Sequence, residues 1–348
     1  MSSKTILVTG GTGYIGSHTI IELLNAGYDV INVDNGINSN PSESIKRLEE
    51  ITGKKLKKNY SLDLGVESEL RKVFQENSDI VTVIHFAALK AVGESVHKPL
   101  EYYTNNVAGT LVLLRVMKEF NVKNFVFSSS ATVYGVVDDC PESGMTEDRS
   151  INANSPYGTT KVFVEYILRD LKVAQPDWNI AILRYFNPVG AHSSGRIGED
   201  PKGIPNNLVP YILQVMTGRR EFLSIYGDDY ETKDGTGIRD YIHVVDLAKG
   251  HIAAAKFLEG KNGVCEAINL GTGRGMTVFD VLNSLKKVSG KEIPHKVMPR
   301  RAGDVTIYLA DVSKAKKLLG WSAELTLDEM CADAWNWARL NPEGLSSS

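Results

Sequence analysis

The sequence predicts an α/β protein built on a Rossmann-type, doubly wound parallel sheet, with a smaller C-terminal α/β substrate lobe. Two observations support this. Short apolar stretches alternate with amphipathic helical stretches over residues 5–184, which is typical of a parallel sheet with right-handed crossovers. The first strand, residues 5–8, also leads into the glycine-rich sequence TGGTGYIG at residues 9–16 and then into a helix ending near residue 26. Strand, glycine turn and helix form the context in which glycines bind a phosphate.

The glycine turn indicates a dinucleotide. Gly10, Gly13 and Gly16 allow the backbone to turn tightly and to approach a pyrophosphate at the positive end of the helix. Asp34 follows the second strand, residues 29–33, and a carboxylate there can accept both ribose hydroxyls of an adenosine. It would also repel a 2′-phosphate, so we expect NAD rather than NADP. A structural glycine turn without a ligand is the alternative.

The later elements continue the alternation. Helices are expected at residues 40–51, 66–76, 99–120 and 156–171, and strands at residues 80–86, 124–128 and 179–184, with a short strand ending near Asp63. Ligands of open parallel sheets bind beyond the carboxyl ends of the strands. Asp63 could meet the adenine amino group there, or it could cap the following helix. Lys90, after another strand, could meet a ribose or a phosphate.

The chain changes character after Asn187. Glycine and proline become frequent through residues 190–210, and a polar, glycine-rich stretch follows at 227–237. Helices are expected at residues 206–217, 245–258, 278–288 and 327–340. We expect an NAD-binding domain of residues 1–186, to which 238–270 return, and a smaller substrate-binding lobe of residues 187–237 and 271–348.

The composition excludes several classes of protein. A net charge of −3 over 348 residues, with no basic cluster, argues against nucleic-acid binding. Cys140, Cys265 and Cys331 are scattered, without zinc-site spacing, so we expect a reducing compartment and no metal site. No apolar run approaches the roughly 20 residues of a membrane span, and the first strand begins too early for a signal peptide. A cytoplasmic enzyme is expected.

A catalytic group is predicted near the start of the helix at 156–171. Tyr157 and Lys161 are four residues apart and share one helix face. A phenol has a pKa of roughly 10, and a neighbouring ammonium and a nicotinamide cation are expected to lower it. Ser130 follows a strand, where its hydroxyl can bind the substrate oxygen. Beside a nicotinamide, these groups suit alcohol–ketone interconversion by hydride transfer. Taken alone, the tyrosine–lysine pair could also lie on a solvated helix face.

The chain resembles a known family. The glycine turn, SSSATVYG at residues 128–135 and YGTTK at residues 157–161 resemble the extended short-chain dehydrogenase/reductase superfamily. Within it, residues 6–342 resemble the UDP-glucose 4-epimerase (UDP-galactose 4-epimerase) family. The matching runs are HFAALKAVGES at 85–95, RYFNPVGAH at 184–192, GIPNNL at 203–208 and RDYIHV at 239–244. Residues 136–155 match poorly, so we expect a surface loop there.

The resemblance implies an isomerase of galactose metabolism. It would interconvert UDP-galactose and UDP-glucose at carbon 4 through a 4-keto intermediate and transient reduction of tightly bound NAD. Tyr157 would act as the base, Lys161 would hold the cofactor ribose and lower the tyrosine pKa, and Ser130 would polarise the sugar oxygen. The keto sugar would then rotate and present its other face.

The resemblance also implies two sets of binding residues. The cofactor would contact Gly10, Gly13, Tyr14, Ile15, Gly16, Asp34, Asn35, Asp63, Leu64, Phe86, Ala87, Lys90, Asn105, Tyr157, Lys161 and Tyr185. The substrate would contact Lys90, Ser130, Tyr157, Asn187, Asn206, Asn207, Leu208, Ser224, Tyr226, Arg239, Tyr241, Arg301, Asp304 and Tyr308. Arginines suit the diphosphate because a guanidinium binds its oxygens bidentately. Without the family, Arg301 could equally be a surface ion-pair partner.

Two further properties follow from the resemblance. A bulky Tyr308 would narrow the sugar pocket, so we expect poor turnover of UDP-N-acetylhexosamines. The helices at 99–120 and 156–171 carry more apolar surface than one sheet contact covers, so we expect a homodimer through a four-helix bundle.

Two alternative functions remain to be weighed. A nucleotide-sugar 4,6-dehydratase would need a carboxylate pair directly after the catalytic serine or threonine, where this chain has Ala131 and Thr132. A silent NAD-binding sensor would lack the Tyr157–Lys161 pair.

Overall fold

The computed structural model describes residues 4–301 and 303–345, and its centre is a seven-stranded sheet. The strand order is β10-β6-β5-β4-β1-β2-β3, and every neighbouring pair is parallel. The strands are β1 (Thr5–Thr9), β2 (Asp29–Asp34), β3 (Lys58–Ser61), β4 (Ile80–His85), β5 (Asn124–Ser130), β6 (Asn179–Tyr185) and β10 (Val264–Leu270). The order reverses between β1 and β4, where doubly wound sheets bind their ligands. The predicted fold class is confirmed.

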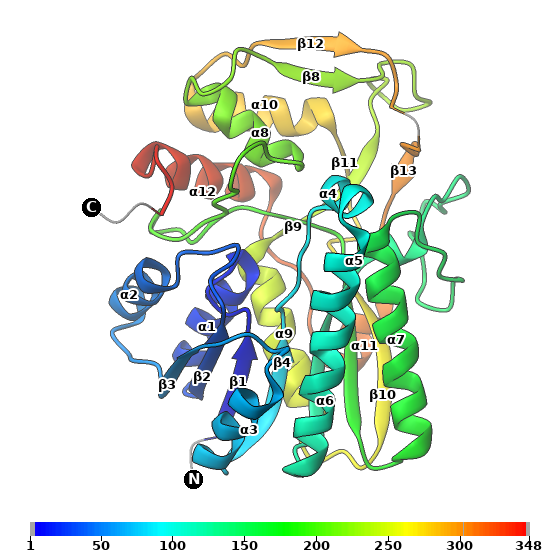
Figure 1. The fold of residues 1–348 in the computed structure, drawn as a ribbon. Coiled ribbons are helices and arrows are strands. Elements are labelled where there is room, and N and C mark those ends of the chain that lie inside the picture. The colour runs from blue at the N-terminus through cyan, green and yellow to red at the C-terminus, as the bar shows by residue number, and fades with distance from the viewer. Residues whose placement is uncertain (1–3, 302, 346–348) are drawn as a thin grey trace.

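Two helical layers bury the sheet because its strands are apolar on both faces. In β1, Ile6 and Val8 face one core and Leu7 faces the other. The first core lies under α1 (Tyr14–Asn25), α2 (Pro41–Thr52) and α9 (Val244–Leu258). The second lies under α3 (Glu67–Glu76), α6 (Gly109–Glu119) and α7 (Pro156–Ala174), on the opposite side of the sheet (Figure 1).

The long helix expected over residues 99–120 is built from three joined segments. They are α5 (Pro99–Tyr102), the π-helical η1 (Tyr103–Ala108) and α6. Within η1, the Asn106 amide exchanges two hydrogen bonds with the backbone of Leu89, at 2.8 and 2.9 Å. The widened turn therefore holds the segment after β4 against the helix. A short helix, α4 (Val92–His97), lies between them and was not predicted.

A smaller lobe lies above the main sheet in Figure 1. A four-stranded sheet contains β7 (Asn187–Val189), β9 (Ile238–His243), β11 (Gly275–Thr277) and β13 (Ile307–Tyr308), and a two-stranded sheet pairs β8 (Leu223–Tyr226) with β12 (His295–Met298). Its helices are α8 (Leu208–Met216), α10 (Val278–Ser289) and α12 (Leu327–Leu340), which share one core with the strands. Of the segment 238–270, α9 and β10 lie on the main sheet, whereas β9 belongs to the small one.

The segment 136–155 is irregular as expected, but the prediction that it is a surface loop is wrong in part. Met145 and Val137 are buried in a small cluster with residues of η2 (Ala131–Tyr134). Met145 also forms a parallel bridge with Ala310, which precedes α11 (Ser313–Leu319). A buried apolar side chain and this bridge hold the loop against the body of the protein.

The described residues contain neither a membrane-spanning helix nor a cluster of metal-binding side chains. Across residues 4–301 and 303–345, no helix is long and apolar enough to cross a membrane. In the same part of the chain, no three histidine, cysteine or acidic residues gather as they would around a metal ion.

Candidate active site

A cleft of about 1300 Å³ runs along the carboxyl ends of the central strands. Every residue predicted to contact the cofactor lines it, from Gly10 to Tyr185. Of the residues predicted to contact only the substrate, Asn206 and Asn207 line it as well. The topology therefore brings together residues that are far apart in the chain, from Gly10 to Asn207.

The glycine turn is packed too closely for side chains. Gly10 has φ +69°, and a Cβ atom there would lie 2.7 Å from the Ala87 nitrogen. A Cβ atom on Gly16 would lie 2.3 Å from the Gly10 carbonyl oxygen. Gly13 precedes α1 without a side-chain cap, so the first turn presents its N–H groups to the cleft. This cradle fits the diphosphate of a dinucleotide.

Asp34 is anchored by the same loop. Its Oδ2 atom accepts hydrogen bonds from the Thr12 nitrogen at 3.0 Å and from the Thr12 hydroxyl at 2.6 Å. Its Oδ1 atom accepts one from the Gly36 nitrogen at 2.9 Å. A carboxylate has about four acceptor positions. Oδ1 also accepts a long hydrogen bond from the Ser39 hydroxyl, at 3.4 Å, and an adenosine ribose could replace this weak donor.

Asp63 does not cap the next helix, because the N-cap of α3 is Val66, which has no side-chain cap. Asp63 accepts hydrogen bonds from the Gly65 nitrogen at 2.7 Å and from the Asn35 amide at 3.1 Å. Both Asn35 and Asp63 line the cleft. The local capping alternative is wrong, and the carboxylate lies at the cleft wall.

Ser130, Tyr157 and Lys161 meet at the ends of β5 and α7. The Ser155 hydroxyl accepts the Gly158 N–H at 3.2 Å and so caps α7, which starts with Pro156. The Lys161 ammonium donates to the Ser128 carbonyl at 2.6 Å and lies 5.8 Å from the Tyr157 ring centroid. Strand end and helix start thus bring the hydroxyl, the phenol and the ammonium together.

Burial dominates the protonation of this group. It raises the pKa of Tyr157 to about 12, although the adjacent Ser130 hydroxyl lowers it, and it lowers the pKa of Lys161 to about 7. Both shifts disfavour the charged forms. The expected lowering of the phenol pKa is therefore not met by the protein alone. The physical reason is that the cost of desolvation exceeds the stabilisation of a phenolate by the Ser130 hydroxyl.

The charged substrate residues lie together in the small lobe. Arg239 donates to the carbonyls of Ile238 and Val305, both at 2.9 Å, and its Nη2 atom lies 3.9 Å from Asp304 Oδ1. Arg301 donates to Asp304 Oδ2 at 2.9 Å, with its guanidinium 4.7 Å from the Tyr226 ring centroid. Arg301 is thus an exposed ion-pair partner, but within a cluster that contains a second arginine able to bind an anion.

The other predicted substrate residues differ in exposure. Asn187, Leu208, Ser224 and Tyr308 are half-buried, and Asn206 and Asn207 are exposed. Tyr241 is buried in the core of the small lobe, and burial raises its pKa to about 12.

Tyr308 links the small lobe to the catalytic group. Its hydroxyl donates to the Ala131 carbonyl at 2.6 Å, one residue after Ser130. Its ring lies 5.9 Å from that of Phe186. The tyrosine is therefore held in place beside the residue predicted to polarise the sugar oxygen.

Two contributors to the cleft were not predicted. Thr12 orients Asp34, and Glu199 accepts a hydrogen bond from Lys90 at 3.1 Å across the cleft. The threonine could have been found from its place between the glycines, where its short polar side chain faces the end of β2. Glu199 lies in an irregular segment, and no local pattern indicates its partner.

Comparisons with known proteins agree with this geometry. A family model described as GDP-mannose 4,6 dehydratase matches residues 7–334. The UDP-glucose 4-epimerase of Dictyostelium discoideum is 57% identical over 99% of this chain and 98% of its own length. The UDP-glucose 4-epimerase of Bacillus subtilis is 54% identical over 99% of each chain. The UDP-glucose 4-epimerase of Bifidobacterium longum, solved with NAD+ and UDP, is 55% identical with a TM-score of 0.90, covering 98% of this chain and 99% of that one.

Proposed function

We propose a residue-level mechanism for this chain, which belongs to the UDP-glucose 4-epimerase family of the extended short-chain dehydrogenases/reductases. The protein interconverts UDP-galactose and UDP-glucose at carbon 4 of the sugar, through a 4-keto intermediate and bound NAD. One observation carries the mechanism: Tyr157 and Lys161 line the same cleft as the glycine cradle. A proton-transferring group and a dinucleotide site therefore share one cavity.

The glycine cradle and α1 hold the cofactor diphosphate, and Asp34 accepts a ribose hydroxyl through Oδ1. NAD, when bound, accepts a hydride from carbon 4 and returns it to the other face of the same carbon. Lys90, which Glu199 holds at 3.1 Å, lies within reach of the cofactor from the opposite wall. The remaining cofactor residues, named above, form the walls of the cleft.

Tyr157 takes the proton from the sugar 4′-hydroxyl and gives it back when the configuration has been inverted. Ser130 hydrogen-bonds the same oxygen. Lys161 binds the ribose next to the nicotinamide and stabilises a phenolate electrostatically. Because burial raises the phenol pKa to about 12 in the protein alone, the positive charge of the oxidised ring is needed to bring it toward neutral pH.

The small lobe holds the uridine diphosphate while the sugar rotates. Arg239 and Arg301 bind the diphosphate oxygens, and Asp304, which already pairs with both arginines, orients them. The other nucleotide contacts come from Asn187, Asn206, Asn207, Leu208, Ser224 and Tyr226. Tyr241, buried in the lobe core, acts by supporting β9 beneath Arg239. A tight grip on the nucleotide combined with few contacts to the hexose permits rotation.

Tyr308 restricts the sugar pocket. Its hydrogen bond to the Ala131 carbonyl fixes the ring beside Ser130, which supports exclusion of an N-acetyl group. UDP-galactose and UDP-glucose are turned over, and UDP-N-acetylhexosamines poorly. Comparable turnover of UDP-N-acetylgalactosamine by the purified protein would contradict this specificity.

The protein is a homodimer in the cytoplasm. Exposed aromatic and aliphatic side chains on α6 and α7 support pairing of these helices, including Leu111, Phe163 and Tyr166. Light scattering at micromolar concentration should give twice the chain mass, and Phe163→Glu should give the single-chain mass. Three free cysteines support a reducing compartment, which fractionation of the source cells can test.

The dehydratase alternative lacks a catalyst for elimination. Although the matching family model carries a dehydratase description, the residues after Ser130 are Ala131 and Thr132. Neither is the carboxylate pair that elimination of water across carbons 5 and 6 would need. The intact Tyr157–Lys161 pair likewise argues against a silent NAD-binding sensor.

The test of the proposed function uses the protein as purified, with no cofactor added. UDP-galactose is supplied and formation of UDP-glucose is followed. Conversion without added NAD is expected. If nothing happens until free NAD is added, and reduced cofactor then accumulates, the protein is a net dehydrogenase and the proposal is wrong.

A further inference from the structure

We infer that residues 341–345 form a strap that retains NAD by tying two cleft-lining segments together at the adenosine end of the cleft. The inference rests on the proposed function, since it takes NAD to be the ligand of this cleft. It concerns how long the cofactor stays bound, and it adds Asn40, Asp200 and Leu345 as positioning residues.

The strap is held by contacts among three residues, Asn40, Asp200 and Leu345, and all three line the cleft. The Asn40 side-chain amide donates to the Leu345 carbonyl at 2.6 Å. The Leu345 N–H donates to Asp200 Oδ2 at 2.9 Å. Leu345 is itself buried. The backbone of one residue therefore bridges the loop after β2 and the loop before α8.

The Asn40 end of the strap is connected to the proposed ribose site. Asn40 follows Ser39, whose hydroxyl lies 2.9 Å from that of Thr12. Thr12 in turn donates twice to Asp34. Movement of Asn40 away from Leu345 would disturb the residues that orient the carboxylate. The strap and the ribose carboxylate thus belong to one hydrogen-bonded chain.

The Asp200 end is fixed by the C-terminal helix. The Trp337 indole donates to the Glu199 carbonyl at 3.0 Å, and the Asn341 amide donates to the Gly195 carbonyl at 2.8 Å. These contacts hold residues 195–200, which include Glu199, the partner of Lys90 across the cleft. The loop wall of the cleft therefore depends on the chain segment that ends in the strap.

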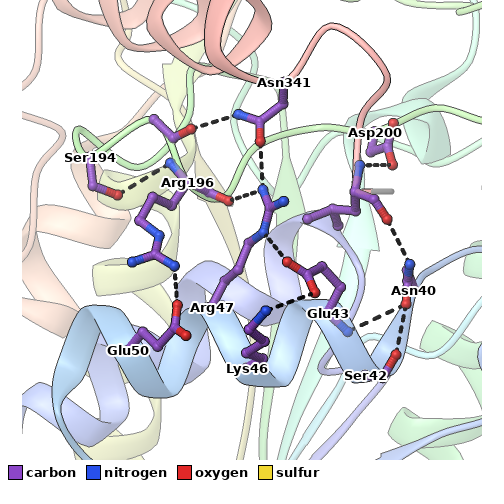
Figure 2. A network of polar contacts seen from close by, with 12 residues as sticks. Asn40, Ser42, Glu43, Lys46, Arg47, Glu50, Ser194, Arg196, Asp200 and Asn341 are labelled. Atoms are coloured by element: carbon purple, nitrogen blue, oxygen red, sulfur yellow. Dashed lines mark hydrogen bonds and ion pairs between the residues drawn. The ribbon is translucent and has the colours of Figure 1, made fainter. Parts of the chain in front are cut away.

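Arg47, on α2, connects the segments around the strap. Its guanidinium donates to Glu43 at 2.7 Å, to the Arg196 carbonyl at 3.0 Å and to Asn341 Oδ1 at 2.6 Å (Figure 2). One side chain thus joins α2, the cleft loop and the residue that follows α12. Gly344, with φ +74°, allows the close approach, because a Cβ atom there would lie 2.1 Å from Asp200 Oδ1.

This geometry predicts an effect on cofactor release rather than on chemistry. The strap lies at the Asp34 end of the cleft, and none of its members contacts Ser130, Tyr157 or Lys161 in the described bonds. Release of a dinucleotide requires the loops around Asn40 and Asp200 to separate. An epimerase must keep its reduced cofactor until the hydride returns, so slow release serves the reaction directly.

The experiment measures release of NAD from three variants of the full chain. Asn40→Asp keeps the acceptor that caps α2 but loses the donor to Leu345. Asp200→Ala removes the acceptor, and Leu345→Pro removes the N–H. Protein loaded with isotopically labelled NAD is mixed with excess unlabelled NAD, and retained label is followed with time. Each variant should release NAD about three- to tenfold faster, the effect of one lost hydrogen bond.

Two matched variants keep the result specific. Asp200→Asn retains a side-chain oxygen for the Leu345 N–H, and Glu50→Gln removes only the exposed ion pair with Arg196 on the same loop. Both should release NAD within about twofold of wild type. Asp200→Asn keeps the acceptor for Leu345, and the exposed ion pair lost in Glu50→Gln contributes little. Turnover of the three strap variants should recover with saturating free NAD.

Three outcomes would overturn the inference. If wild type retains labelled NAD and all three strap variants release it at the same rate as wild type, the strap is contradicted but the proposed function is not. If Asp200→Asn and Glu50→Gln accelerate NAD release as much as the three strap variants do, the cause is a general loosening of the region and not a strap. Loss of label from wild type during mixing would contradict the proposed cofactor site, and the strap with it.

Discussion

The cofactor cleft and the small lobe differ in how their residues are held. In the cleft, glycine backbone, Thr12 and Asp34 are fixed by the main sheet, and the predicted cofactor residues line one cavity. In the small lobe, Arg239 and Arg301 lie on short strands and loops and share a single carboxylate, Asp304. The cleft is formed without a ligand, whereas under the proposed mechanism the lobe arginines would exchange Asp304 for a phosphate.

The difference fits the separate requirements that the proposed reaction places on the cofactor cleft and on the small lobe. Under the proposed mechanism the cofactor must return the hydride to the carbon that lost it, which fits a site fixed by hydrogen bonds and close glycine contacts. The sugar must rotate, so only the nucleotide is gripped. Substitutions should therefore separate into those that affect turnover, those that affect NAD and those that affect only the UDP-sugar.

The largest effect is expected at Tyr157. Tyr157→Phe removes the proton acceptor and should lower kcat by about a thousandfold, within the usual contribution of general acid–base catalysis. Bound NAD should remain, since the cradle is untouched. Tyr166→Phe, on the exposed side of the same helix, should leave kcat within twofold. Equal kcat for Tyr157→Phe and wild type would contradict the role of the phenol.

The next largest effect tests the cradle. In Gly16→Ala the new Cβ atom would lie 2.3 Å from the Gly10 carbonyl oxygen, so the turn must shift. NAD affinity, measured by titrating cofactor-free protein, should fall by about a hundredfold. Gly93→Ala has no atom within 4 Å of its Cβ and should bind normally. Tight NAD binding by Gly16→Ala would show that the cradle is not the diphosphate site.

The folding stability of the protein should depend on pH because Lys161 is buried. Burial lowers the pKa of Lys161 to about 7 in the folded protein, far below its ordinary value. Between pH 7 and about 10 the unfolded chain binds a proton that the folded chain does not, so stability should rise with pH. The cofactor-free protein should gain on the order of 1 kcal/mol per pH unit, measured by urea unfolding at pH 7 to 9.5.

The control for this pH effect is Lys161→Met, which has no ammonium to titrate. Its stability should lack that rise over the same interval. The raised pKa of Tyr157 acts with the opposite sign, but only above pH 10. An equal rise in wild type and Lys161→Met would assign the effect to other groups.

The smallest effect belongs to the lobe. Arg301→Ala should raise KM for UDP-galactose about tenfold, the value of one charged hydrogen bond, with NAD retention unchanged. The adjacent Arg300 is paired with Asp229 and lies over the Tyr230 ring, 4.0 Å from its centroid, so Arg300→Ala should leave KM within twofold. Steady-state kinetics on both variants separates the two arginines. Similar KM values for both would contradict the assignment of Arg301.

The same contrast explains how much could be read from the sequence. Asp34 and Lys90 follow strand ends, which a parallel sheet brings to one edge, and Tyr157 lies in the first turn of α7, the next α-helix after β5, so all three could be predicted. The contacts of Glu199 and Leu345 could not, because irregular segments carry no periodic pattern. The π-helical turn was missed for a related reason, since its apolar spacing reads as a continuous helix.

The pKa of Tyr157 in the protein without its cofactor could not be predicted from the sequence. Residue types indicate which charges are neighbours but not how deeply a group is buried. Once the phenol and the ammonium are both enclosed, desolvation disfavours the charged form of each group.

The most direct test of the central claim follows the hydrogen on carbon 4. UDP-galactose carrying deuterium at that carbon is converted by the purified protein in the presence of free, unlabelled NAD, and the UDP-glucose formed is analysed by mass spectrometry and NMR. The mechanism predicts that deuterium stays on carbon 4 of the product, because the hydride returns from cofactor that never leaves the cleft. Loss of deuterium to the free cofactor or to water would contradict it.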